Sequence, residues 1–88
     1  MDNRAIADRL TGHAHSLERT SHSLFRIKAY RRAAETILGL GCPVEEIIEK
    51  QGRKGLEDLP GIGRRLSQAI INLIHTGEMP VGGHGGTS

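Results

Sequence analysis

Hydrophobic residues recur every three or four positions along most of the chain, a pattern that predicts amphipathic helices. The first helix is expected over about 3–19, with a buried face formed by Ile6, Leu10, Ala14 and Leu17. The second is expected over about 24–38, with a buried face formed by Leu24, Ile27, Tyr30, Ala34, Ile37 and Leu38. Between them, the Ser and Thr residues of 20–23 can cap the start of the second helix.

The second half of the chain shows the same periodicity in shorter pieces. Pro43 suits the first turn of a third helix, which ends at Gln51-Gly52 and buries Val44, Ile47 and Ile48. A short helix over about 54–58 and a last helix over about 63–75 follow, and the last one buries Leu66, Ile70, Leu73 and Ile74. No stretch alternates hydrophobic and polar residues as a strand does. We therefore predict an all-α fold, a compact bundle of four to five short helices.

Length and composition are those of one small intracellular domain. The 88 residues, 36% of them hydrophobic, allow a single core over 1–80, followed by a flexible Gly-rich tail over 81–88. Cys42 is the only cysteine, so no disulfide can form within the chain. No hydrophobic run is long enough to cross a bilayer. We expect a cytoplasmic protein without a membrane partner, associated with the nucleoid if it is bacterial.

The most informative segment connects the short helix to the last one and reads Leu59-Pro60-Gly61-Ile62-Gly63-Arg64-Arg65. Pro60 ends the preceding helix, and the two glycines permit a tight turn that Ile62 can anchor in the core. Two arginines at a helix start are unfavourable beside the positive end of the helix dipole, unless an anion binds there. Free N–H groups at such a start bind phosphate well. The segment predicts a turn that binds DNA phosphates through the amides of residues 61–65.

Positive charge is also concentrated on the second helix, although the net charge of the chain is only +2. The run contains Arg26, Lys28, Arg31 and Arg32. Guanidinium groups match the geometry of phosphate. We predict that DNA contacts Arg26, Tyr30 and Arg31 on this helix and Gly61, Ile62, Gly63, Arg64 and Arg65 at the turn. The alternative is a solvated helix face, on which Glu35 pairs with Arg31 or Arg32 at helical spacing.

His13 and His15 fall on different helix faces, and we interpret them as solvated residues rather than metal ligands.

Two segments of the chain resemble known DNA-binding elements. The run Leu59-Pro60-Gly61-Ile62-Gly63 resembles the helix-hairpin-helix motif. The run Phe25-Arg26-Ile27-Lys28-Ala29-Tyr30-Arg31-Arg32-Ala33-Ala34 resembles the second helix of the N-terminal domain of family-X DNA polymerases, the group that contains DNA polymerase beta. Their order and spacing also match, so the resemblance covers about 3–79.

The resemblance implies an activity and a set of site residues. In that family the domain holds gapped or nicked DNA by the 5′ phosphate at the edge of the gap. Arg26 matches the position of a phosphate-binding lysine in some members, Tyr30 matches the family's pocket tyrosine, and Arg65 matches another basic phosphate contact. Carbonyl oxygens at the positions of Glu57, Leu59 and Ile62 bind a monovalent cation, K⁺ or Na⁺, and no other cofactor is expected.

The chain departs from the family in two ways. Ala69 occupies the position of the lysine with which some members excise a deoxyribose phosphate, and a methyl group cannot form an imine. Nothing in the chain supplies the magnesium-binding carboxylates of a polymerase. We expect a non-enzymatic module that binds DNA without sequence specificity, in DNA repair. Three alternatives stay open: an N-terminal fragment of a family-X polymerase, a lyase that uses Lys28, Lys50 or Lys54 instead, and a helical protein-interaction module.

Overall fold

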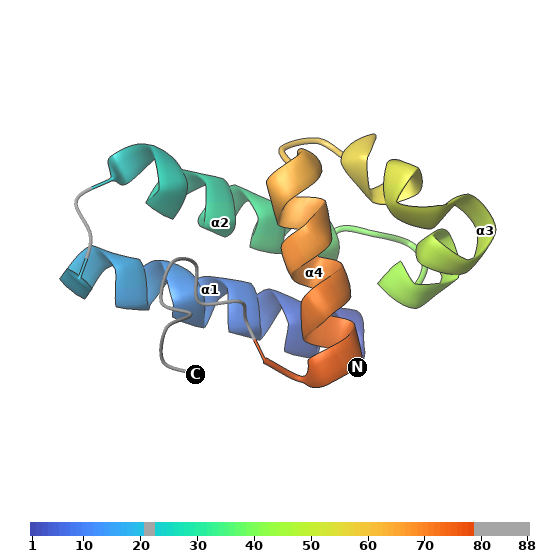
Figure 1. Cartoon of the computed structure of the whole chain (residues 1–88), viewed down its shortest axis with the longest axis horizontal. Helices are drawn as coiled ribbons and strands as arrows, with labels where there is room; N and C mark the ends of the chain where they lie inside the picture. Colours follow the sequence, from blue (N-terminus) through green and yellow to red (C-terminus); the bar gives the residue numbers. More distant parts are fainter. Residues whose placement is uncertain (21–22, 79–88) are drawn as a thin grey trace.

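The computed structural model describes residues 1–20 and 23–78, which form four α-helices and no strand. They are α1 (Asn3–Thr20), α2 (Leu24–Leu38), α3 (Val44–Glu57) and α4 (Arg64–Thr76). Helices α1 and α2 lie side by side in opposite directions, α4 crosses this pair, and α3 packs against α4 (Figure 1). The predicted all-α bundle is confirmed. The tail predicted over 81–88 lies outside the described residues.

The predicted third helix and the short helix after it form one element with a bend. At the bend, Gly52 has φ 69° and ψ −163°, which no residue inside an α-helix adopts. A positive φ favours glycine, because glycine has no side chain to collide with the backbone. The predicted stop at Gln51-Gly52 is therefore confirmed as a bend, and the residues after it lead directly into the turn before α4.

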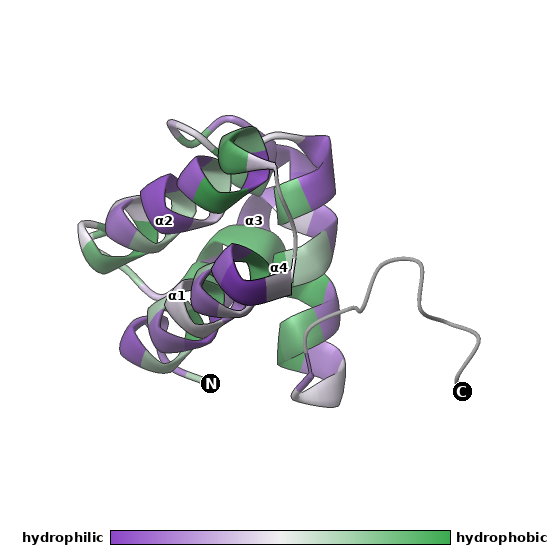
Figure 2. Ribbon diagram, turned by 90° about the vertical axis from the view of Figure 1, so that its left-hand side faces the viewer, coloured by the Kyte–Doolittle hydropathy of each residue, from purple (hydrophilic) through white to green (hydrophobic). Residues whose placement is uncertain are grey.

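The core takes side chains from all four helices. Its largest fully buried hydrophobic residues are Ile6, Leu10, Ile37, Val44, Leu56, Ile70 and Leu73. Burial of each such side chain contributes about 1.5–3 kcal/mol, so the hydrophobic periodicity decides which faces meet. Figure 2 shows the result on α4, whose hydrophobic residues face the other helices while its hydrophilic residues face outward.

Two of the side chains predicted to be buried on α2 are not. Leu24 and Leu38 are 69% and 59% exposed, so this part of the prediction is wrong. They are the first and last residues of α2, and a helix end is buried only where another element reaches it. Ala33 is fully buried instead, and its small side chain lets α2 approach the core closely.

Side-chain caps set where two of the helices begin. Ser23 caps α2, as predicted, by accepting a hydrogen bond from the Arg26 amide at 3.3 Å. Asn3 was not predicted to have such a role: its Nδ2 donates to the Cys42 carbonyl and its Oδ1 accepts from the Val44 amide, each at 2.9 Å. This single amide side chain joins the start of α1 to the start of α3. None of the helices in the described ranges is long and hydrophobic enough to cross a membrane.

Candidate functional site

The turn between α3 and α4 is closed by its own backbone. The Ile62 amide donates a hydrogen bond to the Leu59 carbonyl at 3.1 Å. Gly61 has φ 78°, and the Ile62 side chain beside it is only 2% exposed within the core. The prediction that Ile62 anchors the turn is confirmed. The turn is therefore held at a fixed position over the core, with its glycines at the surface.

A second contact fixes the turn to α2. The Thr36 hydroxyl donates a hydrogen bond to the Pro60 carbonyl at 2.7 Å. One helical turn before Thr36 on α2, the aliphatic part of Arg32 lies over Gly61, where a methyl group added to the glycine would stand 2.8 Å from Arg32 Cδ. Gly61 is thus required for its backbone angle and for the space that the arginine fills.

Backbone amides are free at the start of α4. Gly63 is the N-cap and provides no side-chain cap, and the first hydrogen bond of the helix runs from the Ser67 amide to the Gly63 carbonyl at 2.9 Å. Within the described ranges, the amides of Gly61, Gly63, Arg64 and Arg65 have no backbone acceptor. Of the amides predicted to bind phosphate, that of Ile62 is used inside the turn. The remaining ones form a surface that favours an anion.

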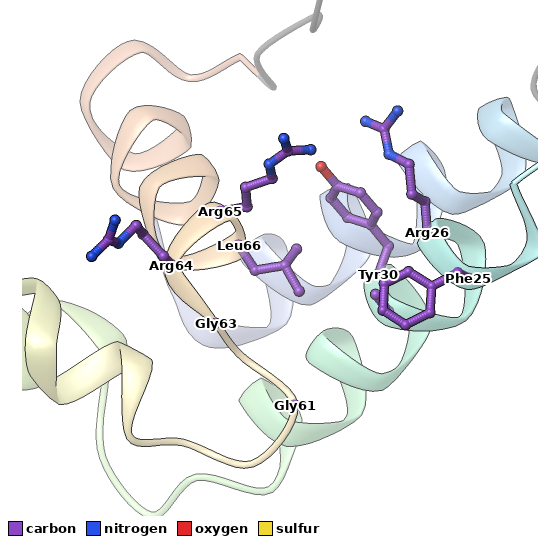
Figure 3. A pocket seen from close by; sticks show the side chains of 9 residues that line it. Phe25, Arg26, Tyr30, Gly61, Gly63, Arg64, Arg65 and Leu66 are labelled. Atoms are coloured by element: carbon purple, nitrogen blue, oxygen red, sulfur yellow. The ribbon is translucent and has the colours of Figure 1, made fainter.

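A pocket of about 320 Å³ opens between this turn and α2 (Figure 3). The structure brings six of the predicted site residues to it: Arg26, Tyr30, Gly61, Gly63, Arg64 and Arg65. Phe25, Ala29 and Leu66 complete its wall. Phe25 was not among the predicted site residues, yet it is 82% exposed at the pocket. The signal for it was an aromatic residue directly before Arg26 in a basic run.

The charged side chains at the pocket point in different directions. Figure 3 shows Arg26 and Arg65 extending to the side where the Tyr30 hydroxyl lies, whereas Arg64 points away toward α3. Neither Arg26 nor Arg65 forms an ion pair with any acidic group of residues 1–20 and 23–78. Two unneutralised cations and a hydroxyl donor therefore face one volume, which suits a phosphate.

His13 of α1 packs against the ring of Tyr30 on α2. Its ring meets the Tyr30 ring edge to face, with centroids 4.6 Å apart and planes at 62°. Burial lowers the pKa of His13 below its ordinary value of 6.5, and the positive charge of Arg26 lowers that pKa further. Our interpretation of His13 as a solvated residue is wrong, since it is half-buried against Tyr30.

Two of the predicted site residues, Arg31 and Ile62, do not line the pocket. The Arg31 guanidinium donates to the Glu18 carboxylate of α1, so Arg31 does not reach the pocket, and its partner is not Glu35. The Ile62 side chain lies in the core, so only the backbone of this residue is available to a ligand. Glu18 also lies 3.5 Å from His15, and this small charged group belongs to the surface between α1 and α2.

The carbonyl groups predicted to bind a cation, those of Glu57, Leu59 and Ile62, accept few backbone hydrogen bonds. The carbonyl of Leu59 accepts one hydrogen bond, from Ile62. The carbonyls of Glu57 and Ile62 accept none from the backbone of the described residues outside the helices. Carbonyl oxygens with unused lone pairs are the kind of ligand that K⁺ prefers. Among residues 1–20 and 23–78, no cluster of His, Cys, Asp and Glu could hold a metal ion.

Ala69, which the resemblance to family-X polymerases matches to a catalytic lysine, lies one helical turn after Arg65. It is 4% exposed and does not line the pocket. The nearby Ser67 is also buried, and its hydroxyl donates to the Arg64 carbonyl at 2.8 Å. This face of α4 is therefore part of the core.

The hairpin, its exposed amides and the two helices that it joins define the chain as a helix-hairpin-helix protein. The sequence profile of the helix-hairpin-helix domain family matches residues 1–79, and the chain belongs to that family. Helix-hairpin-helix domains generally bind DNA. A search among curated proteins finds no match to the chain.

Proposed function

We propose that the chain binds the sugar-phosphate backbone of DNA at the hairpin and the pocket beside it, without sequence specificity. The observation that carries the proposal is the coincidence of free amides at the start of α4 with arginines from two helices around one pocket. Amides and guanidinium groups recognise phosphate and carry no information about the base. With about three phosphates neutralised, the slope of log affinity against log salt should be about −2 to −3.

The pocket suits a phosphate at the end of a strand. A terminal phosphate carries about 1.5 to 2 negative charges at neutral pH, whereas each phosphate within a strand carries one. Arg26 and Arg65 supply two positive charges on the side of the Tyr30 hydroxyl. Together with the resemblance to family-X polymerases, this arrangement leads us to propose a preference for gapped DNA with a 5′ phosphate, as arises during repair. Phe25, at the rim, offers an exposed ring on which an unpaired base can stack.

The domain acts in this proposal by binding and not by catalysis. The buried methyl group of Ala69 cannot form an imine with an abasic sugar. The carbonyls of Glu57, Leu59 and Ile62 would hold a monovalent cation next to the hairpin, where its charge would strengthen attraction to a phosphate. Borohydride trapping on abasic DNA tests the first point, and we expect no covalent cross-link.

The test of the proposal is a salt titration of binding by fluorescence anisotropy. The DNA substrates are an intact duplex, a nicked duplex and two gapped duplexes, one with a 5′ phosphate and one with a 5′ hydroxyl. We expect the 5′-phosphorylated gap to bind most tightly. Replacement of Arg26 or Arg65 by Gln should reduce the salt slope by about 1 and remove most of the preference for the phosphate.

Replacement of both Arg64 and Arg65 by Glu should abolish binding to every substrate. Unchanged binding by that double variant contradicts the proposal. Equal affinities for the phosphorylated and hydroxylated gaps contradict only the preference for a strand end. Salt-insensitive self-association without DNA binding would indicate a protein-interaction module instead.

A further inference from the structure

One face of α2 runs along the hairpin. Phe25, Ala29, Arg32 and Thr36 follow one another at spacings of three and four residues, so they share that face. Phe25 and Ala29 line the pocket, Arg32 lies over Gly61, and Thr36 is bonded to Pro60. Arg32 thus lies on this face between the pocket and the Thr36 hydrogen bond.

The neighbouring arginine lies on a different side of the same helix. Successive residues are rotated by about 100° around a helix axis, so Arg31 faces α1 when Arg32 faces the hairpin. The Arg31 charge is neutralised by Glu18. No acidic group in the described ranges forms an ion pair with Arg32, and its side chain is exposed.

We propose that Arg32 is a phosphate-binding residue of the hairpin, whose side chain reaches the hairpin at Gly61 from the α2 side. The proposal rests on the proposed DNA binding and extends it, because it adds a contact outside the pocket. A strand whose terminal phosphate lies in the pocket would then continue along the hairpin, and Arg32 would bind the next phosphate within that strand.

The packing of the Arg32 side chain against Gly61 restricts its conformation before a ligand binds. A methyl group on Gly61 would stand 2.8 Å from Cδ, 2.9 Å from Cγ and 3.0 Å from Nε of the arginine, so its stem lies directly against the glycine. A long side chain that already lies in one place loses less conformational entropy when it binds a ligand. The aliphatic stem covers the turn while the charged end stays in solvent.

The test compares Arg32→Met with Arg31→Met, because methionine keeps an unbranched aliphatic stem and removes the charge. Binding to the 5′-phosphorylated gapped duplex is titrated between about 50 and about 200 mM salt. Loss of one phosphate contact lowers the salt slope by about 0.7 to 0.9. The affinity deficit of Arg32→Met should therefore be about threefold larger at the low-salt end than at the high-salt end. Arg31→Met should bind like the unsubstituted protein.

A third variant, Arg32→Lys, separates charge from packing. It keeps one positive charge and should keep the salt slope, with an intermediate affinity. The proposal is overturned if Arg32→Met retains the full salt slope, or if Arg32→Lys loses as much slope as Arg32→Met. If the Arg64 and Arg65 double substitution abolishes binding while Arg32→Met does not change it, this inference fails and the proposed function stands. If neither changes binding, the proposed function itself fails.

Discussion

The hairpin offers a direct test of why its two glycines are there, because the structure assigns them different roles. At Gly61, φ is 78° and the place of a side chain is filled by Arg32. At Gly63, φ is −99° and no atom outside its chain neighbours lies within 4 Å of an added methyl group. Alanine at these positions should therefore give opposite results in stability and in binding.

Gly61→Ala should destabilise the fold. A non-glycine residue in the left-handed region costs about 1–2 kcal/mol, and Arg32 must move aside as well. In a domain of this size each kcal/mol lowers the melting temperature by about 4–8 °C. Gly63→Ala should leave the melting temperature unchanged or raise it slightly, because alanine reduces the entropy of the unfolded chain at a backbone angle that it tolerates.

DNA affinity should fall directly in Gly63→Ala, the variant that leaves the melting temperature unchanged or slightly raised. Gly63 lies among the free amides at the start of α4, so an added methyl group should hinder close approach of a phosphate, and loss of one amide–phosphate hydrogen bond should weaken DNA binding by about tenfold. Thermal denaturation followed by circular dichroism measures stability, and anisotropy titration below the melting temperature measures affinity. If Gly61→Ala melts with the unsubstituted protein, or Gly63→Ala is destabilised as much as Gly61→Ala, the reasoning from backbone angle and space is refuted.

Three further predictions concern single side chains. Asn3→Ala should lower the free energy of unfolding by about 1–2 kcal/mol in urea titrations, because it removes the cap of α3; an unchanged midpoint would contradict that role. The lowered pKa of His13 means that the unfolded chain binds the proton more readily, so stability should fall as pH drops below about 6.5. His13→Gln should flatten this decline in urea titrations at several pH values, and an identical decline would exclude His13 as its source. Phe25→Ala should weaken binding to gapped DNA by about 1–3 kcal/mol with little effect on melting, whereas equal loss on intact duplex would argue against base stacking.

Most of the fold could be predicted from the sequence, because the spacing of hydrophobic residues reports directly which helix face is buried. Ile6, Leu10 and Ile70 were placed correctly on that basis. Leu24 and Leu38 were not, because periodicity cannot show where a neighbouring helix ends. The Asn3 cap was missed for a related reason: it joins residues about 40 positions apart, which no local pattern reveals.

The candidate site was predictable in its residue types and less so in its exact members. The turn chemistry of Pro60, Gly61 and Gly63 indicated exposed amides, and the structure has them. The choice between two adjacent arginines depends on the direction in which each projects from α2. Sequence alone favoured Arg31, but the structure turns Arg31 toward Glu18 and Arg32 toward the hairpin.

The hydrogen bond between Thr36 and Pro60 has a thermodynamic consequence. It joins α2, the helix that carries Arg26, to the turn that carries the free amides. The two parts of the proposed binding site are therefore held in position relative to each other before a ligand binds. Association then involves little ordering of the protein, and the heat-capacity change measured by calorimetry should reflect only the surface covered by the ligand.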